Sequence, residues 1–232
     1  MSGPAGPTDA AAGSAAEGRD TAGGVGPMDA AAWDARYAAA SPWGSAPNVF
    51  VVRHTEHLTP GRARDVAAGD GRHALWLAGR GWQVEALDFS AVAIERGRAA
   101  AERLAADGSL TGSVRWRVAD ATTVEPEPSS ADLVVMAYLH LPAEAARQAL
   151  VRAAATLAPG GTFVVVGHDR SNLAGGVGGP RSIEVLTDPQ TVADALTDAG
   201  LDVQVCEVAP RPVDGADRPA LDTLVVAVRP AG

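Results

Sequence analysis

Residues 65–90, DVAAGDGRHALWLAGRGWQVEALDFS, contain the pattern that decides the fold. Two glycines, Gly69 and Gly71, stand between an apolar run and a run with helical spacing, and Asp88 closes the next apolar run. Glycines at such a turn let the backbone approach a ligand closely, because they lack a Cβ atom. The helix that follows offers unpaired N–H groups at its positive end, and an acid after the second strand is placed to accept hydrogen bonds from ribose hydroxyls. The stretch therefore predicts a strand–turn–helix–strand unit that binds a nucleoside-bearing cofactor.

Outward from this unit, apolar runs alternate with helical patterns. The expected strands are residues 62–67, 83–88, 114–120, 132–137 and 162–167, and the expected helices are 72–80, 90–106, 144–157 and 189–199. Such alternation is typical of a parallel sheet covered by helices on both faces. The last two apolar runs, 201–208 and 223–228, have no helix between them and must pair antiparallel. We expect an α/β, Rossmann-like three-layer sandwich with a seven-stranded, mostly parallel sheet that ends in a C-terminal antiparallel hairpin.

The N-terminal part of the chain differs in amino-acid composition from the rest. Residues 1–28 are mostly small residues with almost no large apolar side chains, so they cannot offset their ordering entropy, and we expect a disordered tail. Residues 29–60 hold two helical patterns, the first with Asp29 as N-cap, and are expected to form a helical cap. Residues 61–232 are then the cofactor-binding domain.

Composition excludes several classes of function. The chain has 232 residues, of which 47% are apolar, as expected for one globular domain with a packed core. Its formal net charge of −9 argues against a nucleic-acid partner, because phosphate binding needs basic clusters. The sequence has no apolar run of about 18 residues that would span a membrane. The single cysteine, Cys206, excludes an internal disulfide, and no signal-peptide pattern opens the sequence, so we expect a cytoplasmic protein.

Two cofactors compete for the glycine turn. Gly69-x-Gly71-x-x-Ala74 satisfies the pattern of NAD-binding turns, which leaves an NAD-dependent oxidoreductase as an alternative. However, Asp65 directly precedes the turn, where a carboxylate repels a pyrophosphate but is able to hold an ammonium group. Asp120, just past the third strand, is placed to accept from an adenine amino group. The antiparallel hairpin is also foreign to the ordinary dinucleotide fold. S-adenosylmethionine, with one adenosine, one ammonium and one carboxylate, suits these groups better than NAD.

At these residues the sequence resembles the class I S-adenosylmethionine-dependent methyltransferases, over about residues 30–230. The resemblance rests on DVAAGDGR for the glycine loop, VEALDFS for the ribose acid, VADA for the adenine segment, DLVVMAYLHLP for the fourth strand and LAPGGTFVVVGHD for the turn into the fifth. Within the class, GRHALWLAGRGWQVEALDFS and LAPGGTFVV are similar to the small-molecule branch that includes tellurite-resistance and thiopurine methyltransferases. The sequence departs from the motif at Ala67, which stands where the family has its first glycine.

The resemblance implies a set of cofactor contacts. Asp65, Gly69 and Gly71 are expected around the methionine part, Asp88 on the ribose, and Tyr138 near the sulfonium. Arg36 and Tyr37, on the first helix, are either a cover over the carboxylate or residues that, with Trp33, merely pack this helix on the domain. The full expected set is Arg36, Tyr37, Asp65, Ala67, Gly69, Gly71, Asp88, Phe89, Ser90, Asp120, Ala121 and Tyr138.

The reaction implied is transfer of a methyl group to a small-molecule acceptor by in-line displacement, with sulfur, oxygen, nitrogen and a metalloid all open as the attacked atom. His140 and His168 follow the fourth and fifth strands, and each is either a catalytic base or an anchor of its loop. The glycine-rich segment 170–182 is either a lid over the acceptor or a plain loop. No metal site is expected. A non-catalytic cofactor sensor is a further alternative.

Overall fold

A computed structural model describes residues 29–40 and 44–232 of the chain. The tail expected at residues 1–28 lies outside the described residues. The elements, in chain order, are α1 (Ala30–Ala39), α2 (Val49–Thr55), β1 (Arg62–Val66), α3 (Arg72–Gly79), β2 (Gln83–Asp88), α4 (Ala91–Ala106), β3 (Ser113–Val118), β4 (Ala131–Ala137), α5 (Ala143–Ala154), β5 (Leu157–His168), α6 (Asn172–Gly175), the 3-10 helix η1 (Ile183–Val185), α7 (Pro189–Asp198), β6 (Asp202–Arg211) and β7 (Ala220–Val228).

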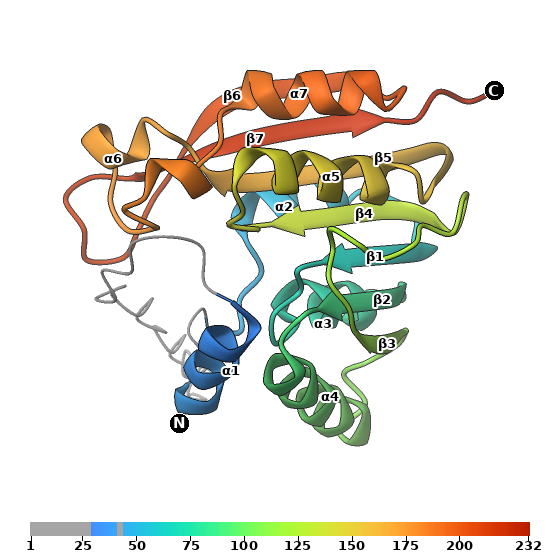
Figure 1. Cartoon of the computed structure of the whole chain (residues 1–232). Helices are drawn as coiled ribbons and strands as arrows, with labels where there is room; N and C mark the ends of the chain where they lie inside the picture. The colour runs from blue at the N-terminus through green and yellow to red at the C-terminus, as the bar shows by residue number, and fades with distance from the viewer. Residues whose placement is uncertain (1–28, 41–43) are drawn as a thin grey trace, which may run out of the picture.

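The strands form one seven-stranded sheet in the order β3-β2-β1-β4-β5-β7-β6 (Figure 1). The first five strands of the chain pair in parallel, and β7 runs antiparallel to both of its neighbours, β5 and β6. The predicted Rossmann-like sheet with a C-terminal antiparallel hairpin is therefore confirmed. The strand order reverses between β1 and β4, and open α/β sheets bind ligands beyond the carboxyl ends of the strands at such a point.

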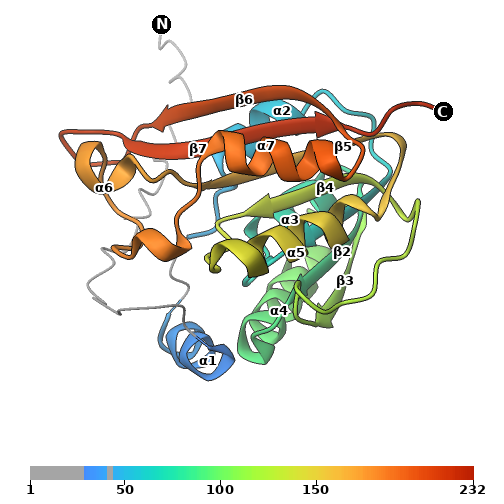
Figure 2. The same ribbon diagram turned by 45° about the horizontal axis from the view of Figure 1, so that its top comes forward.

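Helices cover both faces of the sheet, which gives the expected three layers (Figures 1 and 2). Side chains of α5 and α7, such as Leu150 and Leu196, pack on one face together with the fully buried Phe163 of β5. Side chains of α2 and α3, such as Phe50 and Leu77, pack on the other face. The central strands are therefore buried on both sides and read as continuous apolar runs, as β4 does in ADLVVMA. None of the helices within residues 29–40 and 44–232 is long and apolar enough to cross a membrane.

The helix ends follow from local capping chemistry. Ser90 is the N-cap of α4 and accepts a hydrogen bond from the backbone N–H of Ala93 at 3.1 Å. Asn48 caps α2 by accepting from the backbone N–H of Phe50. Side-chain oxygens at this position satisfy N–H groups that the helix leaves unpaired, so these residues define where each helix begins. Both caps also lie next to the cavity described below.

Two expected boundaries are corrected by the structure. The helix expected over 144–157 ends at Ala154, and β5 begins at Leu157 because a register shift in its pairing with β4 accommodates the APGG turn. The terminal hairpin is longer than expected, since Pro210 and Arg211 of β6 pair with Leu221 and Ala220 of β7. Proline is tolerated there because β6 is an edge strand, where a missing N–H breaks no inner ladder. The longer hairpin brings Arg211 and Asp222 to the end of the sheet that holds the cavity.

Candidate functional site

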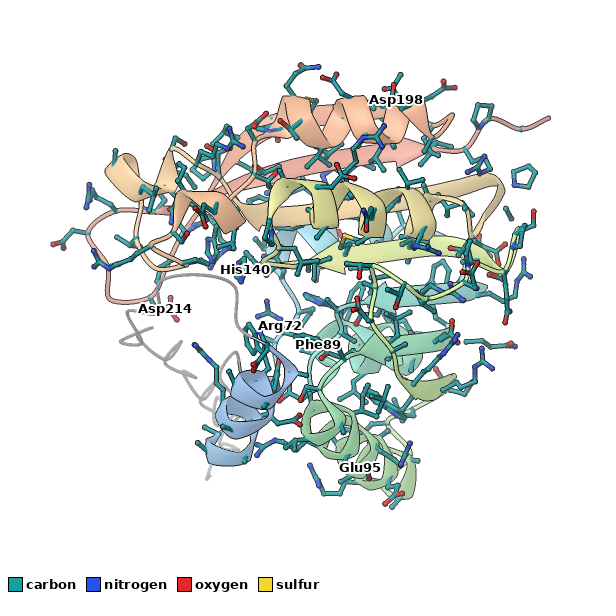
Figure 3. All side chains as sticks on the ribbon, in the orientation of Figure 1. Arg72, Phe89, Glu95, His140, Asp198 and Asp214 are labelled. Carbon is teal, nitrogen blue, oxygen red and sulfur yellow. The ribbon has the colours of Figure 1, made fainter. Side chains whose placement is uncertain are left out.

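A cavity of about 260 Å³ opens at the carboxyl ends of β1, β2 and β4, between these strands and α1. Figure 3 shows Arg72, Phe89 and His140, three of its lining residues, gathered between α1 and the strand ends. Nine of the predicted site residues line this cavity: Tyr37, Ala67, Gly69, Asp88, Phe89, Asp120, Ala121, Tyr138 and His140. Five predicted residues are not among its lining residues: Arg36, Asp65, Gly71, Ser90 and His168.

The turn after β1 lies in the left-handed region at three positions. Ala67 has φ +58°, Gly69 has φ +58° and Gly71 has φ +86°. A side chain at Gly69 would collide with the hydroxyl of Tyr37, and one at Gly71 would collide with the ring of Trp116. Glycine is thus required at both positions by the backbone conformation and by close packing. Ala67 adopts the same conformation with a Cβ atom, which costs roughly 1–2 kcal/mol, and strain of this kind concentrates at functional sites.

Asp88 lies at the end of β2 and faces the cavity. Its Oδ2 accepts a hydrogen bond from the backbone N–H of Gly69 at 2.9 Å, and its Oδ1 accepts from the backbone N–H of Ser90 at 2.8 Å. Burial raises the pKa of this carboxyl above its ordinary value, although both backbone bonds oppose the shift. A carboxylate has about four acceptor sites, so two remain for hydroxyl donors of a ligand. Ser90 therefore holds the Asp88 carboxylate in place through its backbone N–H and does not itself line the cavity.

Asp65 lies beneath the glycine turn. Only 1% of the residue is exposed, and its Oδ2 accepts from the backbone N–H of Ala74 at 3.0 Å, near the start of α3. Its Oδ1 is buried and has no hydrogen-bond partner within the described part of the chain. Burial raises the pKa of this carboxyl to about 7. The observed contact of Asp65 is thus with the first turn of α3, and its contact with an ammonium group stays a prediction.

Helix α1 closes one side of the cavity. Trp33 and Tyr37 line it, and the Arg36 guanidinium lies 5.5 Å from the centre of the Trp33 ring. Tyr37 is 4% exposed, so it both packs the helix and covers the glycine turn. The structure adds Asp34, which sequence reasoning missed: its Oδ1 accepts from the Ser90 hydroxyl at 2.5 Å. Nothing in the pattern of α1 set this acid apart from a solvated one, so only the fold reveals its partner.

The predicted adenine end of the cavity is formed by the segment after β3 and by Phe89. Ala121 is buried and lines the cavity together with Asp120. The Asp120 Oδ1 accepts from both the backbone N–H and the hydroxyl of Thr122, each at 2.7 Å. These bonds hold the segment in a turn, with Asp120 at the cavity wall. Its contact with an adenine amino group stays a prediction.

A buried polar network surrounds Tyr138, just past the end of β4. Tyr138 has φ +60°, and its hydroxyl donates to Asp222 Oδ2 at 2.7 Å while it accepts from the Asn48 side-chain amide at 2.8 Å. Asp222 is fully buried, and its Oδ2 also accepts from Arg211 Nε at 2.8 Å. Burial and the charge of Asp222 raise the pKa of Tyr138, so its hydroxyl keeps its proton near neutrality. Sequence reasoning missed Asp222, although a lone acid within the apolar run ALDTLVVAV was a usable signal.

His140 and His168 lie together, as expected for residues after neighbouring strands. Their rings stack with centroids 5.7 Å apart, and His168 Nδ1 lies 3.3 Å from Asp222 Oδ1. Of the two, only His140 lines the cavity, and Gly179 packs against the ring of His168. Burial, aided by His168 and Arg36, lowers the pKa of His140 to about 3. His140 is therefore a neutral imidazole in this site and a weak base.

The glycine-rich segment 170–182 contacts the terminal hairpin. Asn172 donates to the carbonyl of Gly178 at 2.9 Å and accepts from the backbone N–H of Leu221 at 2.8 Å. These bonds close the segment over His168. No group of three or more His, Cys, Asp or Glu side chains that could hold a metal ion occurs among the described residues.

Comparisons with known proteins agree with this geometry. Residues 64–161 match the family model of a methyltransferase domain. A search of curated proteins found no match. Among solved structures, the chain is similar to an S-adenosylmethionine-dependent methyltransferase from Methanosarcina mazei, with 17% identity and TM-score 0.64 over 81% of this chain and 100% of the other. It is also similar to TehB from Haemophilus influenzae, with 14% identity and TM-score 0.64 over 85% and 67% of the two chains.

A third similar structure is magnesium protoporphyrin IX methyltransferase from Synechocystis, with bound S-adenosylhomocysteine. It is 15% identical, with TM-score 0.59 over 89% of this chain and 90% of the other. At these identities the likeness is one of fold.

Proposed function

We propose that the chain is a class I, S-adenosylmethionine-dependent methyltransferase that transfers a methyl group to a small-molecule acceptor, a proposal supported by the match of residues 64–161 to a methyltransferase domain. With the cofactor bound, a sulfur, oxygen, nitrogen or metalloid atom of the acceptor would bond to the methyl carbon as the methyl–sulfur bond breaks in line, and S-adenosylhomocysteine would leave. The observation that carries the proposal is the cavity wall that the glycine turn, Asp88 and Tyr138 form together. In this wall the glycine turn lets the cofactor approach the backbone closely, Asp88 accepts from hydroxyl donors, and Tyr138 forms a polar end for the acceptor.

The chemistry of the wall fits S-adenosylmethionine. The left-handed glycine turn offers close backbone approach, and Asp88 has acceptor sites left for ribose hydroxyls. The buried, unpaired Oδ1 of Asp65 lies under the same turn, and an ammonium group nearby would offset the cost of leaving it unpaired. Phe89, Asp120 and Ala121 supply the wall for adenine in this proposal. The NAD alternative gains no support, because the matched family is a methyltransferase domain.

The cofactor supplies the chemistry of the reaction, since its sulfonium makes the methyl group a good electrophile. The residues of this chain need to align the acceptor and keep water out, and such positioning supplies up to about 7–11 kcal/mol of barrier reduction. Tyr138 suits this role, because its hydroxyl is held by Asn48 and Asp222 and its backbone by a left-handed conformation.

His140 contributes a hydrogen bond to the acceptor in this proposal and does not remove its proton. A base with a pKa of about 3 binds a proton too weakly to take one from a hydroxyl or a thiol at neutral pH. Acceptors that attack without help from this histidine, such as a neutral amine or a group that is already ionised, suit this arrangement. His168 stacks on the ring of His140 and contacts Asp222, and in this proposal it positions His140.

A nucleic-acid acceptor is disfavoured by the formal net charge of −9. We place the protein in the cytoplasm, a proposal supported by Cys206, which is exposed on β6 and free.

The test is turnover with methyl-labelled S-adenosylmethionine against a panel of amines, thiols, phenols, carboxylates and metalloid oxyanions. We expect label transfer to at least one small acceptor, with a mass gain of one CH₂ group, and no transfer by the Asp88→Ala variant. Binding of the cofactor without transfer to any acceptor would favour the sensor alternative.

A further inference from the structure

Polar contacts join helix α1 to the start of α4. The Oδ1 of Asp34 accepts from the hydroxyl of Ser90 at 2.5 Å and from the backbone N–H of Val92 at 3.2 Å. One turn further along each helix, Arg96 donates to the backbone carbonyl of Tyr37 at 2.8 Å. Of the ten residues of α1, only Tyr37 is buried. These polar contacts therefore add to the packing of Tyr37 and fix where α1 meets the start of α4.

The contact made by Asp34 continues into the cavity wall. Ser90 donates its hydroxyl to Asp34, while its backbone N–H donates to Asp88 Oδ1 at 2.8 Å. Asp88 in turn accepts from the backbone N–H of Gly69. Helix α1, the acid after β2 and the glycine turn are thus joined by consecutive hydrogen bonds. The same helix places the Tyr37 hydroxyl directly against Gly69.

We propose that Asp34 is a positioning residue for the cofactor: it fastens α1 to the start of α4, so that Trp33 and Tyr37 close the cavity over the ligand. The inference rests on the proposed cofactor site. Because Trp33 and Tyr37 line the cavity only while α1 is docked, a ligand enters or leaves when this attachment opens. Asp34 touches neither the ligand nor the reacting atoms in this account and acts through Ser90 and α1.

The test measures binding of S-adenosylhomocysteine by stopped-flow tryptophan fluorescence, to which Trp33 in the cavity wall contributes. Asp34→Ala removes the acceptor of two hydrogen bonds, and we expect the dissociation rate to rise by about tenfold or more, since bonds to a charged acceptor are the strong ones. Asp34→Asn keeps an acceptor oxygen at reduced strength, so we expect an intermediate rate. Glu95→Gln is the matched control, because it removes one acidic charge from α4 where Glu95 pairs with Arg98 on the same helix; Figure 3 labels its position.

A second readout separates positioning from a purely structural role. The charge of Asp34 is one of the causes that raise the pKa of Asp88. Removing that charge lowers the pKa of Asp88, so the acid limit of S-adenosylhomocysteine binding moves to lower pH in both Asp34 variants and stays in place in Glu95→Gln.

The inference is overturned if both Asp34 variants release the ligand at the wild-type rate. It is equally overturned if Asp34→Asn, the less disruptive variant, matches wild type while Asp34→Ala loses its thermal unfolding transition, since Asp34 then serves stability alone. Failure of the wild-type protein to bind S-adenosylhomocysteine or S-adenosylmethionine overturns the proposed function, and this inference with it.

Discussion

The carboxylate of Asp88 accepts a hydrogen bond of 2.9 Å from the backbone N–H of Gly69, which joins the end of β2 to the turn that follows β1. The acid and the glycine turn are therefore one unit. A change in the position of either residue moves the other. This coupling explains why an acid at the end of the second strand and a glycine turn 19 residues earlier occur together in a cofactor site.

Asp88→Ala removes both the expected ribose contact and this link to Gly69. Hydrogen bonds to a charged acceptor contribute about 1.5–3 kcal/mol each, so we expect affinity for S-adenosylhomocysteine to fall by about tenfold to a hundredfold or more. Thermal shift and calorimetry measure the loss. Asp107→Ala is the control, because Asp107 is an exposed acid at the far end of α4. Equal affinity of Asp88→Ala and wild type would refute the ribose assignment.

Gly69→Ala tests the close approach of α1 to the turn. The added Cβ would collide with the Tyr37 hydroxyl, so we expect α1 to shift and cofactor affinity to fall by about tenfold or more. Gly108→Ala is the matched control, since Gly108 has a similarly positive φ of +79° but no atom within 4 Å of the added Cβ. Both variants should lose about 1–2 kcal/mol of unfolding free energy from backbone strain. Only Gly69→Ala should lose affinity, and equal affinities in the two variants would contradict the account.

Asp65→Asn tests the buried carboxyl under the turn. Burial raises the pKa of Asp65 from 3.8 to about 7 in the folded protein, so its protonated form favours folding and this contribution is lost as the pH rises through about 7. The variant has no such group. The unfolding free energy of wild type should therefore fall, relative to that of the variant, as the pH rises from about 4 to about 7. This relative fall is at most about 4 kcal/mol, at about 1.4 kcal/mol for each pKa unit.

Urea unfolding of both proteins without ligand, at several pH values, measures this difference. The substituted asparagine side chain retains an oxygen for the Ala74 backbone N–H, so the bond to α3 is preserved. Stability curves that run parallel through this pH range would show that Asp65 is ionised throughout in the folded protein.

Asp222→Asn tests the buried network beside Tyr138. It removes the charge of the carboxylate to which Arg211 Nε donates; the Arg211 side chain is 12% exposed, and breaking a buried pair costs about 3–5 kcal/mol. Asp132→Asn breaks the exposed pair with Arg62 and should cost about 0–1 kcal/mol. Chemical unfolding at neutral pH measures both, and equal costs would contradict the structural role given to Asp222.

The pH dependence of this pair has a defined sign. Burial alone would raise the pKa of Asp222, but contacts with His168 and Arg211 hold it below its ordinary value. A carboxyl with a lowered pKa stabilises the fold above its unfolded pKa and loses this contribution as the pH falls through its folded value. The advantage of wild type over Asp222→Asn should therefore shrink below about pH 4.

Much of the fold was readable from the sequence because its signals are local. The apolar runs of β1, β2 and β4 are bounded by glycine, proline or acidic residues, and α4 begins at a serine cap. The glycine turn and Asp88 pointed to the end of the sheet where the cavity lies, since these residues lie close together in the quoted stretch, whereas Asp65 does not line the cavity. The predicted parallel pairing and the antiparallel end followed from the presence or absence of crossover helices.

The remaining features depend on contacts between distant segments. Asp34 and Ser90 are 56 residues apart in the sequence, and Tyr138 and Asp222 are 84 residues apart. Neither hydrogen bond is therefore visible in a local pattern. The length of the terminal hairpin was underestimated because Pro210 and Arg211 were read as loop, whereas edge pairing with β7 accommodates both. His168 was expected as either a catalytic base or an anchor of its loop. Gly179 packs against its ring, a contact that depends on the path of the 170–182 segment.

The central claim is that the cavity beside Asp88 holds S-adenosylmethionine. Isothermal titration calorimetry of the whole chain with S-adenosylmethionine, S-adenosylhomocysteine and NAD tests it most directly. We predict saturable binding of the first two ligands at one site per chain, lost in Asp88→Ala, and no heat of binding from NAD. Saturable binding of NAD, with no binding of either adenosyl ligand, would contradict the claim.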